Sequence, residues 1–119
     1  MKSIIIAEDE DAMRNAFARA LSAHGYHVRT VSDGTQALAL CKCEIPDLVI
    51  TDVFMPNKDG FGLMHDLRKE FPKVKIITMS GHLDAHAMLH VKEQMGSDLA
   101  LTKPFLLGKA LEAVRSLLN

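Results

Sequence analysis

Cysteine is scarce in this chain, which has only Cys41 and Cys43 among its 119 residues. One residue separates the two thiols, and on a helix such neighbours point in different directions. They therefore form neither a disulfide with each other nor a zinc site, because both structures require converging thiols. We expect both cysteines to be ordinary reduced thiols.

Runs of basic residues and long apolar stretches are also missing. Lys and Arg number 14 against 15 Asp and Glu, so the chain lacks the electrostatic footprint that nucleic-acid binding usually requires. Three isoleucines follow Met1 and Lys2, but the acidic residues from Glu8 to Asp11 end this apolar run too early for a signal peptide. No other stretch is long enough to span a membrane. We therefore expect a cytoplasmic protein that binds neither nucleic acid nor membranes directly.

The chain does contain a repeated unit, in which a short aliphatic run is followed by an amphipathic helix. Five such units predict an α/β fold with a parallel sheet. The first, third and fourth runs are apolar enough to lie buried on both faces, and the more polar second run suits an edge. The predicted strands are Ser3 to Ala7, His27 to Val31, Leu48 to Thr51, Val74 to Met79 and Leu99 to Thr102.

Capping signals mark several helix boundaries. Gly25 stands where the first helix should end, and Asp33 to Gln36 has the form of a capping box that starts the second helix. The last helix opens at Leu106 and Gly108 without a good N-cap residue, so we expect its start to fray. We find no linker, low-complexity tract or second domain, and expect residues 1–119 to form one domain.

Polar side chains stand where the predicted strands run out. Right-handed crossovers make a doubly wound five-stranded sheet the simplest arrangement for this chain, and ligands bind such sheets at the C-terminal ends of the strands. We therefore expect the side chains at these ends to converge on one site. They are Glu8, Asp9, Asp52, Ser80 and Lys103.

These motifs resemble, in type and order, those of response-regulator receiver domains of bacterial two-component signalling. The resemblance covers essentially the whole chain and includes Glu8-Asp9, the segment Asp52 to Gly60, Ser80-Gly81 and Thr102 to Phe105. It implies a flavodoxin-like (βα)5 fold with strand order 2-1-3-4-5. It also implies a cis peptide bond before Pro104, a form that is nearly confined to X-Pro steps.

A cation is expected among the carboxylates, because acidic groups brought close together repel one another. Mg²⁺ is the natural choice, since it is hard, prefers oxygen ligands and keeps several waters. We expect Asp9 and Asp52 to bind it, with Glu8 acting mainly through water. The resemblance assigns one further ligand to the backbone carbonyl of Phe54.

The resemblance also supports a chemical role for Asp52. We expect it to be the nucleophile that accepts a phosphoryl group from a phosphohistidine on a histidine kinase or a histidine phosphotransfer protein. The ammonium of Lys103, together with Mg²⁺, would neutralise the charge on the transferred group. The protein would then be a signalling phosphoacceptor rather than an enzyme, and it would act on a downstream protein target.

Four residues bear on how the signal is transmitted and how long it lasts. Ser80 can donate a hydrogen bond to a phosphoryl oxygen and so pull its loop toward the site. The resemblance implies an aromatic partner for this switch at the position of Ala100, and alanine has no rotamer with which to respond. Phe54 and His82 lie two residues beyond Asp52 and Ser80, where they could tune hydrolysis of the phosphoryl group. The alternative is that both rings point to solvent.

Three other classes of protein are alternatives. A haloacid-dehalogenase-like Mg²⁺ phosphatase would also use carboxylates, a hydroxyl and a lysine, but it leaves Asp52 and the Met55-Pro56 pair that follows unexplained. A flavodoxin-like FMN binder would need a loop rich in glycine and hydroxyls after the first strand, where this chain has acidic residues. The third alternative is a receiver-like interaction module that works without phosphorylation.

Overall fold

Strands and helices alternate strictly along the chain, and the computed structural model describes all 119 residues. The strands are β1 (Ser3–Ala7), β2 (His27–Val31), β3 (Leu48–Asp52), β4 (Lys75–Ser80) and β5 (Leu99–Thr102). The helices are α1 (Asp11–Ala23), α2 (Gly34–Cys43), α3 (Gly60–Glu70), α4 (Ala85–Met95) and α5 (Leu107–Leu118).

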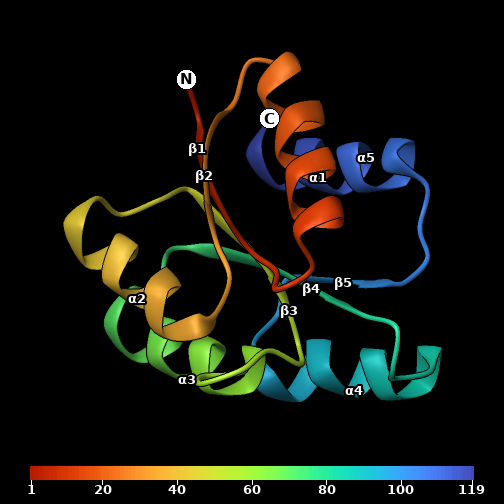
Figure 1. The fold of residues 1–119 in the computed structure, drawn as a ribbon. Helices are drawn as coiled ribbons and strands as arrows, with labels where there is room; N and C mark the ends of the chain where they lie inside the picture. Colours follow the sequence, from red (N-terminus) through yellow and green to blue (C-terminus); the bar gives the residue numbers. More distant parts are fainter.

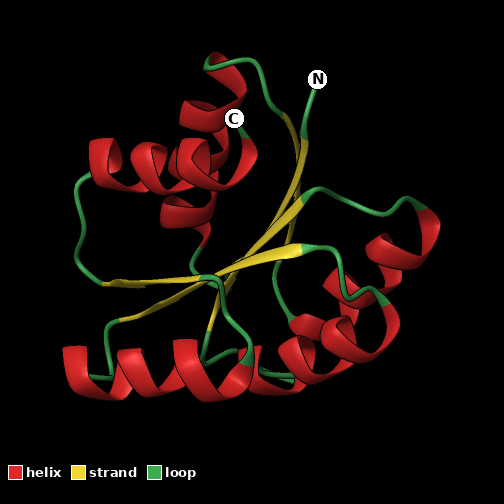
Figure 2. Cartoon of the chain, turned by 180° about the vertical axis from the view of Figure 1, so that it is seen from behind, coloured by secondary structure: helices red, strands yellow, loops and turns green.

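The five strands form one parallel sheet in the order β2-β1-β3-β4-β5, which confirms the predicted flavodoxin-like topology. Helices α1 and α5 lie on one side of the sheet, and α2, α3 and α4 lie on the other (Figure 1). The view from behind shows the same three layers around the central strands (Figure 2). The chain is therefore doubly wound, as its alternating pattern predicts.

The core consists of two apolar layers, because successive side chains of a strand point to opposite faces of the sheet. Ile5, on one face of β1, packs with residues of α2 and α3, whereas Ile4 and Ile6 pack on the other face with residues of α1 and α5. All three isoleucines are completely buried. Burying each such side chain contributes roughly 1.5–3 kcal/mol, so the two layers supply most of the driving force for folding.

Three strand boundaries differ from the prediction by one residue each. Strand β3 continues to Asp52, which pairs with Met79, and β4 begins at Lys75 and continues to Ser80, which pairs with Thr102. Hydrogen bonding to neighbouring strands sets these limits, and the aliphatic pattern does not report it. The polar strand β2 lies at an edge of the sheet, as predicted.

Side-chain caps mark the start of three helices. Asp33, Asp59 and Asp84 each accept a hydrogen bond from a backbone N–H in the first turn of α2, α3 and α4. Helix α5 begins after Leu106 without a side-chain cap, in agreement with the sequence. Gly25 has a φ of +89°, a backbone conformation that suits glycine and follows the end of α1.

None of the helices combines the length and the apolar character needed to cross a membrane.

Candidate functional site

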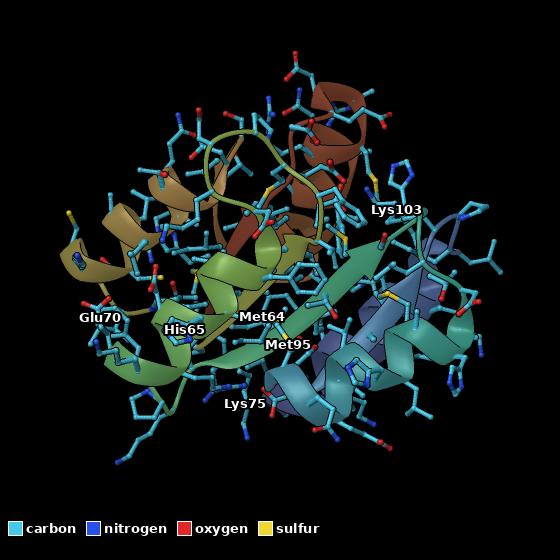
Figure 3. The ribbon with its side chains drawn as sticks, turned by 90° about the horizontal axis from the view of Figure 1, so that it is seen from below. Met64, His65, Glu70, Lys75, Met95 and Lys103 are labelled. Atoms are coloured by element: carbon cyan, nitrogen blue, oxygen red, sulfur yellow. The ribbon has the colours of Figure 1, made fainter.

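The C-terminal ends of β1, β3 and β5 bring polar residues from distant parts of the chain into one pocket of about 310 Å³. Figure 3 shows Lys103 at one end of the sheet and Lys75, the first residue of β4, at the opposite end. Parallel strands place all their C-termini at the same edge, so the pocket follows directly from the topology. Its lining residues are Glu8, Asp9, Glu10, Asp52, Phe54, Gly81, His82 and Lys103.

Lys103 provides the positive charge of the pocket. Its Nζ donates a hydrogen bond to Asp52 Oδ2 over 2.9 Å and a second to the carboxylate of Glu8. Burial opposes the charged ammonium, but the hydrogen bonds to Glu8 and Asp52 outweigh it and raise the pKa of Lys103. The lysine therefore stays protonated at neutral pH and lies against the side chain of Asp52.

Glu8 is the most deeply buried carboxylate of the site, with 1% of its surface exposed. Burial raises the pKa of its carboxyl, while hydrogen bonds from Lys103 and from the backbone N–H of Glu10 offset part of that rise. The Glu10 N–H lies 3.2 Å from Glu8 Oε2, so both carboxylate oxygens have protein donors. The Glu8 carboxylate is therefore held in place by hydrogen bonds at both oxygens.

A cation fits between the three acidic side chains. Oxygens of Glu8, Asp9 and Asp52 lie within 4.8 Å of one another, and Lys103 is the one cationic side chain lining the pocket. Asp9 is exposed and leaves its carboxylate oxygens open to solvent, whereas Asp52 is only 6% exposed. Such an oxygen-rich and acidic site suits a hard divalent ion.

Ser80 lies next to the pocket but is completely buried. Its Oγ accepts a hydrogen bond from the backbone N–H of His82 over 3.0 Å, which closes a tight turn after β4. The O–H of Ser80 takes no part in that bond and can still donate a hydrogen bond to another acceptor. The structure thus places the predicted switch residue beside the site, at the start of the loop that leads to α4.

Phe54 and His82 contact each other at the mouth of the pocket. Their ring centroids are 5.5 Å apart and the rings are nearly perpendicular, at 84°. Phe54 also makes an edge contact with Phe61 of α3, at 6.2 Å between centroids. The two rings are partly open to solvent, with Phe54 42% exposed, but they are not independent of each other.

The remaining predicted positions lie on or after β5. Ala100 is half-buried and lines a separate hollow between β5 and α4, together with Met88 and Leu89. The peptide bond between Lys103 and Pro104 is cis. Ala100 therefore lies outside the acidic pocket, whereas Pro104 directly follows Lys103, which lines that pocket.

The sequence did not predict two features in and around the site. Glu10 lines the pocket and donates its N–H to Glu8, although the sequence shows it only as part of an acidic run. Asn57 donates a hydrogen bond from Nδ2 to Asp33 Oδ2 over 2.7 Å, which joins the loop after β3 to the start of α2. No spacing rule connects residues of two separate loops, so the sequence carries no signal for this bond.

Comparison with known proteins identifies the family to which this fold and site belong. The family model described as "Response regulator receiver domain" matches residues 4–115. The chain belongs to this family. It is therefore a receiver domain of two-component signalling, as its motifs predict.

Solved receiver domains share the fold over nearly their whole length. The receiver domain of the Francisella response regulator 1452 is 26% identical and superposes with a TM-score of 0.91, covering 98% of this chain and 96% of that one. The chemotaxis protein CheY4 of Vibrio cholerae is also 26% identical, with a TM-score of 0.90 and 99% of both chains covered.

Curated relatives are similar in sequence but longer. The "Probable transcriptional regulator ycf27" of Cyanophora paradoxa is 38% identical over 99% of this chain and 48% of its own length. The response regulator MprA of Mycolicibacterium vanbaalenii is 34% identical over 98% of this chain and 50% of its own length. This receiver chain thus spans about half the length of these relatives.

Proposed function

We propose that this receiver domain accepts a phosphoryl group on Asp52 from a phosphohistidine of a histidine kinase or a histidine phosphotransfer protein. The observation that carries the proposal is the placement of Asp52, whose carboxylate borders the pocket 2.9 Å from the ammonium of Lys103. A carboxylate is a competent nucleophile toward phosphorus, and phosphoryl transfer depends mainly on positioning and charge neutralisation.

The transfer is a single displacement at phosphorus. A carboxylate oxygen of Asp52 bonds to phosphorus while the bond from phosphorus to the donor's imidazole nitrogen breaks, and its electron pair leaves with the imidazole. Lys103 orients Asp52 beforehand and then shares its hydrogen bonds with the incoming phosphoryl oxygens. The product is an acyl phosphate on Asp52.

The acidic residues fit Mg²⁺, which would be held by Asp9, Asp52 and the Phe54 carbonyl, with Glu8 acting through water. When bound, this ion neutralises charge on the phosphoryl oxygens. Glu8 meanwhile accepts hydrogen bonds from Lys103 and from the Glu10 N–H, and so keeps the lysine inside the pocket.

Ser80 converts the modification into a conformational change. Its O–H donates a hydrogen bond to a phosphoryl oxygen, which draws the turn from Ser80 to His82 toward Asp52 and shifts the approach to α4. Because Ala100 lacks an aromatic ring, the movement is transmitted by other residues along α4 and β5 to a downstream protein target.

Phe54 and His82 set the lifetime of the acyl phosphate. Their edge contact covers the mouth of the pocket, where hydrolytic water must approach Asp52. The protein assists only its own phosphorylation and dephosphorylation and has no separate substrate, so it is a signalling phosphoacceptor and not an enzyme. The family match gives no support to the phosphatase alternative.

Intact mass after incubation with acetyl phosphate or phosphoramidate and Mg²⁺ tests the proposal. We expect a gain of one phosphoryl mass, roughly 80 Da, that Asp52→Asn and EDTA both abolish. An adduct that persists in Asp52→Asn would place the modification elsewhere. No adduct from small donors or from a cognate kinase would instead favour an interaction module that works without phosphorylation.

A further inference from the structure

The loop between β3 and α3, residues 53–59, is closed tightly at its base. The backbone N–H of Gly60 donates to the carbonyl of Val53 over 2.8 Å. A Cβ atom at Gly60 would overlap the carbonyl oxygen of Asp52, so only glycine allows this approach. The base of the loop is thereby held against the last residue of β3, which is the proposed phosphoacceptor.

The tip of the same loop is attached to the start of α2 at two points. Asn57 Nδ2 donates to Asp33 Oδ2 over 2.7 Å, and the backbone N–H of Gly34 donates to the carbonyl of Lys58 over 2.9 Å. A Cβ at Gly34 would lie 2.6 Å from that carbonyl oxygen, which shows how closely the two segments approach. Asn57 has a φ of +65°, a left-handed conformation that asparagine tolerates better than most residues.

Asp33 uses its two carboxylate oxygens for two different elements. Oδ1 accepts the N–H of Gln36 over 2.9 Å and caps α2, while Oδ2 accepts the amide of Asn57. These hydrogen bonds lower the pKa of Asp33, with the Gln36 N–H contributing most and Asn57 next. The side chain is therefore charged at neutral pH, and its hydrogen bond to Asn57 is charge-assisted.

Phe54 lies between the closed base of the loop and its attached tip, on the only stretch of the loop that borders the acidic pocket. Its backbone N–H points toward Asp52 Oδ1, at 3.4 Å. Mg²⁺ demands near-ideal octahedral geometry, so a loop that supplies one carbonyl ligand must be held in a single conformation. Residues that orient a ligand from outside the site commonly change metal affinity by roughly 10–100-fold when they are mutated.

We propose that Asp33 and Asn57 are positioning residues for the metal site, because their hydrogen bond holds the loop after β3 in the conformation that presents Phe54 to Mg²⁺. This inference rests on the proposed function, since it assigns a role toward the same site. Neither residue lines the acidic pocket, so their effect is transmitted through the backbone of residues 54–58.

Exchanging the two residues provides a sharp test. Asn57→Asp places two carboxylates face to face, whereas the double variant Asp33→Asn with Asn57→Asp restores a donor and an acceptor in reversed order. In that double variant, the asparagine introduced by Asp33→Asn would still accept the Gln36 N–H with its carbonyl oxygen, and asparagine caps helices as well as aspartate does. Asn57→Gly removes the hydrogen bond but retains the left-handed backbone.

Two measurements on unphosphorylated protein read out the effect. Isothermal titration with MgCl₂ should show that Asn57→Asp and Asn57→Gly weaken Mg²⁺ binding roughly tenfold, and that the exchanged pair binds nearly as wild type does. Hydrogen exchange of the metal-free protein should show faster exchange at Gly34 and Gly60 in Asn57→Asp, reversed in the exchanged pair. The extra carboxylate of Asn57→Asp would by itself attract Mg²⁺, so it cannot produce the expected loss.

Asp84→Ala is the matched control, because Asp84 caps α4 through the Ala87 N–H just as Asp33 caps α2, but it has no bond to the loop. It should lower stability without changing Mg²⁺ affinity. Wild-type affinity in both Asn57 variants would overturn this inference and leave the proposed function intact. Wild-type protein that binds no Mg²⁺ and accepts no phosphoryl group would overturn the proposed function, and this inference with it.

Discussion

Lys103 Nζ lies 2.9 Å from Asp52 Oδ2 and at the same time hydrogen-bonds Glu8, so one ammonium group serves two buried carboxylates. The three residues come from the ends of three different strands, and the lysine is 95 residues from Glu8 and 51 from Asp52 in the sequence. Because buried charges require partners, Lys103 acts as a structural counter-ion to both carboxylates.

Removing this lysine should therefore destabilise the metal-free protein. Lys103→Ala leaves Glu8 and Asp52 buried without a cation, and we expect the free energy of unfolding in EDTA to fall by roughly 1–3 kcal/mol. Urea denaturation measures the loss, and added Mg²⁺ should recover part of it. Lys42→Ala serves as a control, because the Lys42 ammonium is exposed and lies 3.9 Å from Glu70. Equal effects of the two substitutions would show that Lys103 is not needed as a counter-ion.

The ion pair between Lys58 and Asp66 should make stability depend on pH in the acidic range. The hydrogen bond from Lys58 lowers the pKa of Asp66 below its ordinary value. A lowered pKa means that the pair stabilises the fold above the unfolded value of about 3.9 and that this contribution is lost as the pH falls through the folded pKa. The difference in unfolding free energy between wild type and Asp66→Asn, under about 1 kcal/mol near neutrality, should thus vanish in acid. A difference that is constant with pH would contradict this expectation.

The two cysteines should react very differently with thiol reagents. Cys41 is completely buried and Cys43 is exposed, and burial raises the pKa of the Cys41 thiol to about 11. Since the thiolate is the reactive form, only Cys43 should be alkylated by iodoacetamide in the folded protein at about pH 8. Mass spectrometry should show one adduct in buffer, two in denaturant and none for folded Cys43→Ser. Labelling of Cys41 in the folded state would show that α2 opens readily.

The edge contact between Phe54 and His82 predicts a change in the lifetime of the acyl phosphate. Phe54→Asn removes the apolar ring and should speed hydrolysis several-fold, because water then reaches Asp52 more easily. Loss of the phosphoryl group is followed by intact mass after the donor has been removed. Phe61→Ala is the control, since it removes the other ring contact of Phe54 but leaves His82 in place. An unchanged half-life in Phe54→Asn rules out shielding by this residue.

The strands and the site residues were predictable because their signals are local. Aliphatic runs such as Ile4 to Ile6 report burial on both faces, and the polar residues that end them fall at one edge of any parallel sheet. The capping box at Asp33 is recognisable for the same reason, and Asp33 does cap α2. The predicted ends of β3 and β4 each differ by one residue from the structure, because pairing between strands extends them to Asp52 and Ser80.

Several side chains make a hydrogen bond or a contact in the structure that the sequence did not predict. Gln36 was expected to complete the capping box that Asp33 begins. Its Oε1 instead accepts hydrogen bonds from the backbone N–H and the hydroxyl of Ser32. The pattern assigns Asp33 only to the helix, but its other oxygen accepts from Asn57. The sequence left open whether the rings of Phe54 and His82 flank the site or point to solvent, and it did not predict their contact with each other. In each case several partners of similar chemistry lie within reach along the chain, and the sequence does not rank them.

By itself, therefore, the sequence determined the order of strands and helices, the family and the set of polar residues at the strand ends, because hydrophobic periodicity and motif order are properties of neighbouring residues. Only the tertiary structure decided which of those groups pair, as with Lys103 and Glu8 or Asn57 and Asp33. Hydrogen bonds act over about 3 Å, so side chains from distant loops form them only where the packed sheet and helices bring them together.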